Sequence, residues 1–391
     1  MKLLSRFRGA CCHQVLAGAL LLALLPVVNA QTGYQVIAIV DQSGAMTDLG
    51  SQVVGGIRSS VKAINDAGGV NGRKVELRVL DSLGSAEGAQ AMFRQAISAK
   101  PIAILNWSTS AGLASIIPLM NTVDIPVISA GQVEAMFKPT PVQWFFTPTF
   151  NGPPMMAAIA GKVEQVLGTL QGKRIAVVGA RAAVIDGFIK DLEDFGQKKG
   201  AVFVAKERIP IPTPSFASQA ANIGRENPDA VITMAIGNDS VTVAKALFDA
   251  DYKGRVFGWG IAGTDQILER INNDRYYGMR LAPSTAPGSE AYAFAQKQGF
   301  ESTATGDMYT QGVALGYILR AGLANCGATC VSKGLMDSIK KVPSIELPVG
   351  FLFGPLAFSE EIHAGATAAA FYVWDPASKK GVMSGQPVRI R

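Results

Sequence analysis

The chain has 391 residues, and its 36 lysines and arginines against 30 aspartates and glutamates give a formal net charge of +6 at pH 7. The cations are scattered or paired, as in Lys198-Lys199, without the dense basic cluster that nucleic-acid binding requires. A chain of this length favours two domains over one large core.

Residues 1–30 have the pattern of a secretory signal peptide. Lys2, Arg6 and Arg8 form a basic start, and an apolar run, Val15–Val28, follows. That run has 14 residues, too few to span a bilayer as a permanent helix, although a membrane-anchoring start is the alternative. We predict cleavage after Ala30, and because the removed segment carries three cations and no acid, the mature chain keeps a net charge of +3.

Strands and helices alternate in the first part of the mature chain. The segment 35–40 is apolar at Val36, Ile37, Ile39 and Val40, which is typical of a strand buried on both faces. A turn is expected at residues 41–44 and another in the Gly-rich run that begins at Asp66. The other predicted strands are 74–82, 102–105 and 125–129, and the predicted helices are 51–66, 86–99 and 111–121. This alternation predicts a parallel sheet with helices on both faces.

The same alternation restarts near residues 144–148. Helices are predicted at 155–167, 185–199, 216–225 and 240–250, and strands at 174–178, 201–207, 230–235 and 256–259. Beyond residue 278 the chain is too short for a third repeat, with helices predicted at 289–298, 308–323 and 332–340 and strands at 350–353 and 370–374. We expect this last part to cross back and complete the first two lobes.

The predicted fold class is therefore α/β, with two doubly wound parallel-sheet lobes joined by a multi-strand hinge. The first lobe would take residues 31–148 and 281–354, and the second would take residues 149–280 and 355–391. In open parallel sheets, ligands bind at the carboxyl ends of the strands. The loops that follow the strands are thus the candidate ligand site.

One candidate loop leads from the strand at 102–105 into a helix and contains Trp107, Ser108, Thr109 and Ser110. Hydroxyl groups and free backbone N–H groups at a helix start make a site suited to a carboxylate. Capping of the helix by Thr109 or Ser110 is the alternative, but it does not account for Trp107, which we expect to be exposed beside them.

The loop after the strand at 125–129 holds Ala130, Gly131 and Gln132. Small residues there would let backbone groups approach a ligand, and a simple tight turn explains them nearly as well. In the second lobe and at its junction with the first, aromatic residues from both sides could enclose an apolar ligand body, with core packing as the alternative. The remaining candidates are Phe150, Val184, Asp186, Asn238, Trp259, Gly260 and Tyr309.

Only Cys326 and Cys330 remain after processing, and an oxidising compartment favours a disulfide between them. A metal site would need further soft ligands, and the mature chain has a single histidine, His363. A redox-active pair usually has two residues between its cysteines, whereas this pair has three. We predict a structural disulfide and no metal.

Patterns that indicate catalysis are weak. The Gly-rich stretch from Gly168 to Lys173 does not have the spacing of a phosphate-binding loop, and no Gly-x-Ser-x-Gly motif occurs. A Ser-His-Asp triad would have His363 as its one candidate base, and we expect this histidine to be structural. The sequence therefore predicts a protein that is not an enzyme and needs no cofactor.

The run Asn65–Leu77, with the sequence NDAGGVNGRKVEL, resembles a signature of periplasmic binding proteins of the branched-chain amino-acid type. Further similarities are Ile125–Ser129, Arg320–Gly322 and Phe358–Gly365, and the resemblance covers nearly the whole mature chain. It implies a type I periplasmic binding fold whose two lobes close on a ligand. These proteins feed ABC transporters, and their relatives bind other amino acids, amides and aromatic acids.

The resemblance also implies roles for single residues. Thr109 and Ser110, with residues 131–133, match the positions that fix a ligand carboxylate. The chain departs from the family pattern at Val184, where an aromatic residue is usual, at Gly260, where an acid pairs with the ligand's amino group, and at Val133, where a hydroxyl is common.

A buried ammonium without an anionic partner is costly. Either Asp186 or Asp265 replaces the missing acid, or the ligand has no α-amino group, and we favour the second. The predicted function is capture of a small carboxylate-containing ligand, or a related amide, for an ABC permease and its ATPases in the periplasm, by a protein that is expected to be monomeric. The alternatives are a subunit that presents the same ligand to a signalling receptor, and an enzyme on a doubly wound fold.

Overall fold

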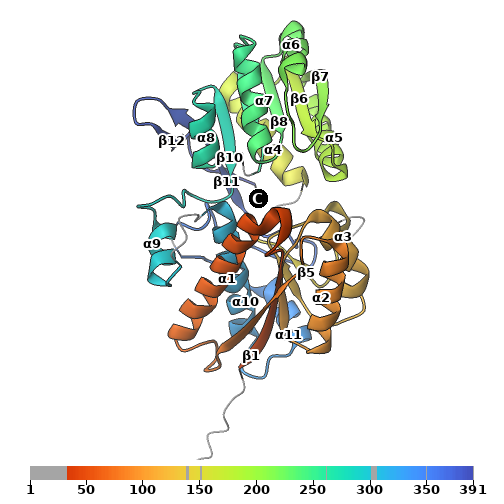
Figure 1. Cartoon of the computed structure of the whole chain (residues 1–391), viewed down its shortest axis with the longest axis vertical. Helices are drawn as coiled ribbons and strands as arrows, with labels where there is room; N and C mark the ends of the chain where they lie inside the picture. Colours follow the sequence, from red (N-terminus) through yellow and green to blue (C-terminus); the bar gives the residue numbers. More distant parts are fainter. Residues whose placement is uncertain are drawn as a thin grey trace, which may run out of the picture. The chain divides into compact units, whose positions relative to one another are not determined.

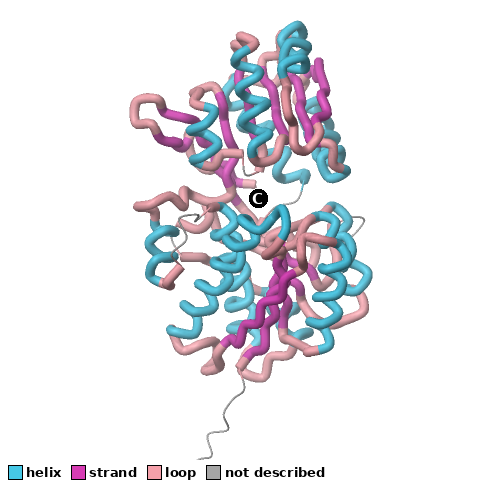
Figure 2. Tube along the Cα trace, in the orientation of Figure 1, coloured by secondary structure: helices cyan, strands magenta, loops and turns pink. Residues whose placement is uncertain are grey.

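The computed structural model describes residues 33–137, 141–149, 152–260, 262–300, 306–348 and 350–390. The predicted signal peptide and Phe150 lie outside the described residues. In the described part of the chain, no helix has both the length and the apolar composition needed to cross a membrane. Two β-sheets, each flanked by helices, organise these residues (Figures 1 and 2).

The first sheet has five parallel strands in the order β2-β1-β3-β4-β5. They are β1 (Tyr34–Val40), β2 (Val75–Asp81), β3 (Ala103–Trp107), β4 (Val127–Ser129) and β5 (Phe145–Phe146). Successive side chains point to opposite faces of a strand. In β1, Val36 and Ala38 accordingly join one core layer, and Ile37 and Ile39 join the other. The predicted strand buried on both faces is confirmed.

Helices cover both faces of this sheet. The helices of this lobe are α1 (Thr47–Asp66), α2 (Ala86–Ser98), α3 (Ser110–Met120), α9 (Glu290–Lys297), α10 (Asp307–Cys326) and α11 (Ser332–Lys341), with the short 3-10 helices η1 (Gly44–Met46) and η2 (Glu134–Met136). Helices α1, α10 and α11 share one core with the sheet, and α2 and α3 share the other. Segments from both ends of the chain thus build the first lobe.

The second sheet has the order β12-β11-β10-β9-β8-β6-β7, with β13 paired to β11. Its strands are β6 (Arg174–Ala180), β7 (Val202–Ile209), β8 (Ala230–Met234), β9 (Arg255–Gly258), β10 (Tyr276–Arg280), β11 (Ala368–Asp375), β12 (Lys380–Met383) and β13 (Val388–Arg389). Strands β6 to β10 are parallel, and β11 is antiparallel to β10, β12 and β13.

Five helices belong to the second sheet. They are α4 (Gly152–Leu167), α5 (Ala183–Lys198), α6 (Ala217–Glu226), α7 (Asn238–Asp249) and α8 (Asp265–Ile271). Helix α4 packs beside α5, and α7 packs between α6 and α8. All five contribute to one apolar core with the sheet.

The chain passes between the two sheets three times: after β5, after β10 and before β11. The first and third passages run side by side, because the Thr147 N–H donates to the His363 carbonyl (2.9 Å), and the Gly365 N–H donates to the Thr147 carbonyl (2.8 Å). The lobe boundaries stay a prediction. Leu356 pairs with Ile345 in the first lobe, which favours a third passage near residue 364 over one near residue 354.

The predicted strand at 350–353 is wrong. These residues form a turn and bends, and Phe351 is fully buried and packs against Phe294 and Tyr309. The apolar run there supplies a single core aromatic, not a hydrogen-bonded strand. Sequence reasoning also missed β10, α8 and β12, whose segments are short and interrupted by glycines or charged residues.

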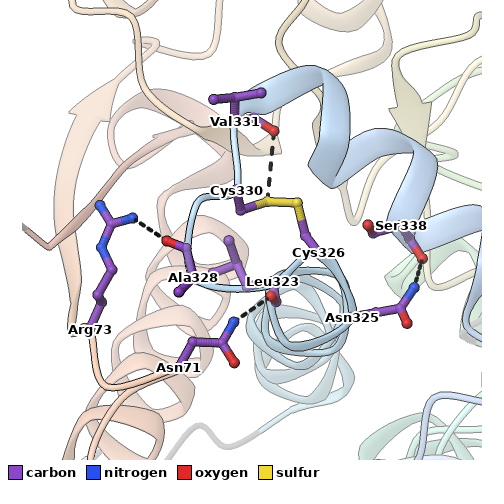
Figure 3. Close-up of a disulfide and its surroundings, with 9 residues drawn as sticks. All are labelled: Asn71, Arg73, Leu323, Asn325, Cys326, Ala328, Cys330, Val331 and Ser338. Atoms are coloured by element: carbon purple, nitrogen blue, oxygen red, sulfur yellow. Dashed lines mark hydrogen bonds between the residues drawn. A yellow bond between two sulfur atoms is a disulfide. The ribbon is translucent and has the colours of Figure 1, made fainter.

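Cys326 and Cys330, the two cysteines predicted to pair, are joined by a disulfide at the end of α10 (Figure 3). The family-like run that follows α1 holds this end in place. Asn71 donates from Nδ2 to the Leu323 carbonyl (2.9 Å), and Arg73 donates from Nη1 to the Ala328 carbonyl (3.2 Å). The signature therefore has a structural role, which is to dock the α1–β2 turn on α10.

Candidate functional site

The carboxyl ends of β1, β2 and β3 are tied together by one buried carboxylate. Asp41 directly follows β1 and is completely buried. Its Oδ1 accepts a hydrogen bond from the Ser82 hydroxyl, and its Oδ2 accepts one from the Thr109 N–H (2.7 Å). Asp41 thus links the loops that follow the two neighbouring strands. Sequence reasoning placed Asp41 in a turn and missed this role, and the only available signal was an acid at the end of a strand buried on both faces.

A second acid, Asp81, lies at the end of β2. Its Oδ1 accepts from the N–H groups of Gln42 (3.0 Å) and Leu83 (2.9 Å). Burial alone would raise the pKa of Asp81, but these bonds and one from the Ser43 side chain outweigh it, and the pKa is lowered. Both acids therefore accept hydrogen bonds from the loops of this edge.

Polar side chains also join the ends of β3 and β4. Asn106 donates from Nδ2 to the Ser108 hydroxyl (3.1 Å), and its Oδ1 accepts from the Ser129 hydroxyl (3.2 Å). The Gly131 N–H donates to the Ser129 oxygen (3.1 Å). An added Cβ on Gly131 would lie 2.8 Å from a Leu113 methyl, so this loop packs tightly on α3.

The predicted residues of the 107–110 loop lie together but play different parts. Thr109 caps α3, since its hydroxyl accepts from the Gly112 N–H (3.2 Å), while Ser108 is buried and Ser110 is exposed. The expectation that Trp107 is exposed is wrong. It is only 9% exposed and packs in the core between the sheet and α1, because it ends β3 on an inward-facing position. Of the next loop, Ala130 is buried, and Gly131 and Gln132 are half-buried.

In the second lobe, the candidates lie at the carboxyl ends of different strands. Val184 and Asp186 belong to the first turn of α5, after β6. Asn238 begins α7, after β8, and its Oδ1 accepts from Arg270. Trp259 and Gly260 follow β9.

Trp259 is half-buried. It packs on Phe188 with ring centroids 5.5 Å apart, and its Nε1 donates to the Ala235 carbonyl (2.8 Å). Gly260 has a φ of +56°, and an added Cβ would meet no atom within 4 Å. The loop after β9 therefore holds an indole fixed by its contacts, followed by a glycine with open space at its Cβ position.

Both aspartates considered as partners of a ligand amino group already have partners. Asp186 forms an ion pair with Arg208 (2.6 Å). Asp265 forms one with the buried Arg280 (3.0 Å) and accepts from the Ser284 hydroxyl (2.6 Å).

Two further residues lie in the core. Tyr309 is fully buried in α10, where its ring stacks on Phe300 with centroids 4.9 Å apart. Burial raises the pKa of Tyr309 to about 12. His363 is buried at the third passage and stacks on Phe146, and its Nδ1 lies 3.0 Å from the Val142 carbonyl.

Among the described residues, no group of three or more His, Cys, Asp or Glu side chains is placed to hold a metal ion.

Comparisons with known proteins agree on one family. Residues 34–381 match the sequence profile of a family described as periplasmic binding protein. The Leu/Ile/Val-binding protein homolog 3 of Brucella melitensis is 21% identical over 359 residues, which cover 85% of this chain and 89% of that protein.

Solved structures share the fold. A branched-chain amino-acid ABC transporter protein from Thermus thermophilus with bound valine has a TM-score of 0.75 at 15% identity, covering 92% of this chain and 97% of that one. A solute-binding protein of an ABC transporter from R. palustris in complex with benzoate has a TM-score of 0.72 at 18% identity, covering 91% and 98%.

Proposed function

Because this chain belongs to the periplasmic binding protein family, we propose that it captures a small ligand between its lobes and delivers it to an ABC permease. The ligand is an amino acid or a related aliphatic or aromatic acid or amide. The observation that carries the proposal is the gathering of polar loops at the carboxyl ends of both sheets, in a chain that passes between the sheets three times. Ligands of open α/β sheets bind at such ends.

Capture works through a difference in affinity. Three passages restrict relative motion of the lobes to a hinge, and a ligand closes the hinge only if it binds the closed state better than the open state. The closed form then docks on the permease, whose ATPase subunits supply the energy. The protein itself makes and breaks no covalent bond.

Two observations favour a ligand without an α-amino group. Asp186 and Asp265 already pair with arginines, and Gly260 brings no charge to the loop after β9. An α-ammonium buried at this edge without an anionic partner would cost several kcal/mol. The indole of Trp259 suits an apolar or aromatic ligand body.

The site of action follows from the predicted signal peptide. We propose that the chain is exported, cleaved after Ala30 and released as a monomer into the periplasm. Mass spectrometry of the exported protein should give a mature terminus at Gln31.

The test is to identify what the protein binds. Native mass spectrometry of freshly purified protein should reveal a small copurifying acid or amide, and calorimetry should then rank leucine, aliphatic acids, aromatic acids and amides. Tight leucine binding would overturn the assignment of a ligand without an amino group. Chemical conversion of the bound compound would overturn the proposed function as a whole.

A further inference from the structure

A side chain of the first lobe contacts a helix of the second lobe beside the candidate loops. Glu134 belongs to η2, in the segment that follows β4, and Gly187 comes directly after the first turn of α5, the helix that follows β6. A Cβ atom added to Gly187 would lie 3.0 Å from Oε2 of Glu134 and 3.4 Å from its Cδ. The Glu134 carboxylate therefore lies against the backbone of α5.

Both sides of this contact are held by the cores of their lobes. Val133 and Met136 flank Glu134 and are buried in the core that the first sheet shares with α2 and α3. On the other side, Ile185 and Phe188 flank the glycine and are buried in the core of the second sheet. The contact can therefore open only if one lobe moves relative to the other.

The charge of Glu134 suits the start of α5. The N-cap of this helix is Ala182, which makes no side-chain hydrogen bond to the free N–H groups. The partial positive charge of a helix N-terminus attracts a carboxylate. Asp186 lies in the same turn, but Arg208 balances its charge with an ion pair at 2.6 Å. A carboxylate from the first lobe therefore stabilises this end of the helix.

Glycine at position 187 makes the close approach possible. A Cβ 3.0 Å from Oε2 of Glu134 would be closer than ordinary van der Waals contact, and a longer side chain would take the space of the carboxylate itself. Two of the candidate ligand residues are close in sequence, since Gln132 precedes Glu134 by two residues and Val184 precedes Gly187 by three. The contact therefore borders the site proposed for the ligand.

We propose that Glu134 is a positioning residue for capture, whose contact with the α5 backbone at Gly187 stabilises the closed arrangement of the lobes. The inference rests on the proposed function and adds to it a contact that favours closure without any help from the ligand. A contact made only in the closed arrangement raises the population of that arrangement. The apparent affinity for a ligand that needs the closed arrangement rises in the same proportion.

The experiment measures the distance between the lobes by double electron-electron resonance on the mature chain. Nitroxide labels are attached at Gln95→Cys in α2 and Ala221→Cys in α6, two exposed positions. The disulfide between Cys326 and Cys330 leaves the mature chain no other thiol to label. Unfolding, dialysis and refolding beforehand remove any copurified ligand.

The labelled protein should show a population with a short distance between the labels, and the substitutions should deplete it. Glu134→Gln should lower the ratio of short to long distances about two- to fivefold, because an amide loses the attraction of the helix N-terminus. Gly187→Leu should lower it about fivefold or more, because leucine takes the space of the carboxylate. In a Glu134→Ala background the same leucine should have a smaller effect, because the shortened side chain leaves room for it.

Gly161→Leu is the matched control. It places the same side chain in a helix of the same lobe, at a glycine where an added Cβ meets no atom within 4 Å, and it should leave the distances unchanged. Circular dichroism and urea unfolding check that every variant folds.

An unchanged distance distribution in folded Glu134→Gln or in folded Gly187→Leu would overturn the inference, and so would an equal shift in Gly161→Leu. The measurement uses no ligand, so its outcome is independent of the calorimetric test. If the ligand panel fails to bind while these distances shift as expected, the proposed function is overturned and the contact stands.

Discussion

At the scale of one residue, His363 shows how burial lowers the pKa of a side chain. Burial lowers its pKa below the usual 6.5, the Val142 carbonyl opposes this by accepting a hydrogen bond, and nearby Lys340 lowers the pKa further. The sequence predicted a structural histidine, and the stacking on Phe146 beside the third passage gives that role a location. This residue lies where two passages between the sheets are hydrogen-bonded to each other.

We predict that His363 makes the fold less stable in mild acid. Because its folded-state pKa is below the unfolded value, the unfolded chain takes up the proton first as the pH falls. Stability is therefore lost from about pH 7 downward, by up to about 1.4 kcal/mol per pH unit, until the pH passes below the folded-state pKa. Urea unfolding of the wild type and of His363→Asn, at pH values from 7.5 to about 5, measures this pH-dependent loss of stability. The stability difference between them should shrink as the pH falls, and a constant difference would refute the prediction.

Other single residues show where local sequence patterns were sufficient. Thr109 caps α3, which was one of the two interpretations that the loop sequence allowed. Trp107 could not be placed in the same way, because whether a strand-ending indole points inward depends on the helices that pack over it. In this chain α1 and α10, which lie far apart in the sequence, form that layer.

At the scale of elements, the contact between α1 and α10 is close because glycines line it. An added Cβ on Gly312 would lie 2.2 Å from the Val53 carbonyl oxygen, and one on Gly56 would lie 2.1 Å from the Tyr309 carbonyl oxygen. The backbones of the two helices therefore touch. This contact joins the start of the first lobe to the part of the chain that returns after β10.

We predict opposite effects for two glycine-to-alanine substitutions in helices. Gly312→Ala should destabilise the fold by about 1–3 kcal/mol or more, because the helices would have to separate. Gly161→Ala in α4 should stabilise it by about 0.5–1 kcal/mol, because nothing lies within 4 Å of the added Cβ and alanine favours the helix. Chemical unfolding of both variants tests the pair. If the two substitutions changed the free energy of unfolding equally, the α1–α10 contact could open without cost.

The disulfide belongs to the same scale, since it closes the turn between α10 and α11. Replacing both cysteines in Cys326→Ser/Cys330→Ser should lower the free energy of unfolding by about 2 kcal/mol, because the closed loop spans a sequence separation of only four. Reduction of the wild type should have the same effect. Full stability in the reduced protein would indicate that Asn71 and Arg73 alone hold this turn.

At the scale of the whole molecule, the chain has the type I periplasmic binding protein fold. The polar loops of each sheet lie on its carboxyl edge, and the passages between sheets run near the ends of β5, β10 and the start of β11. If a ligand contacts both edges, as we propose, it stabilises the closed state, and ligand affinity and hinge closure are then linked.

We predict that a ligand found by copurification stabilises the mature protein and closes it. At a free concentration of 100 times its Kd, it should add about 2.7 kcal/mol to the free energy of unfolding. Differential scanning calorimetry measures the stabilisation, and small-angle X-ray scattering should show a smaller radius of gyration in the complex. Stabilisation without compaction would argue against hinge closure, and a compound of the panel that does not bind serves as the control.

The sequence by itself determined the α/β class, the two repeats and the loops that carry the polar candidates, because apolar periodicity, glycine turns and helix starts are local patterns. Only the tertiary structure decided the partners of these candidates. Asp41 meets Ser82 and Thr109 across separations of 41 and 68 residues, and Asp265 meets Arg280 from a neighbouring strand. Such pairs depend on the order and register of the strands, which hydrophobic patterning along the chain does not encode.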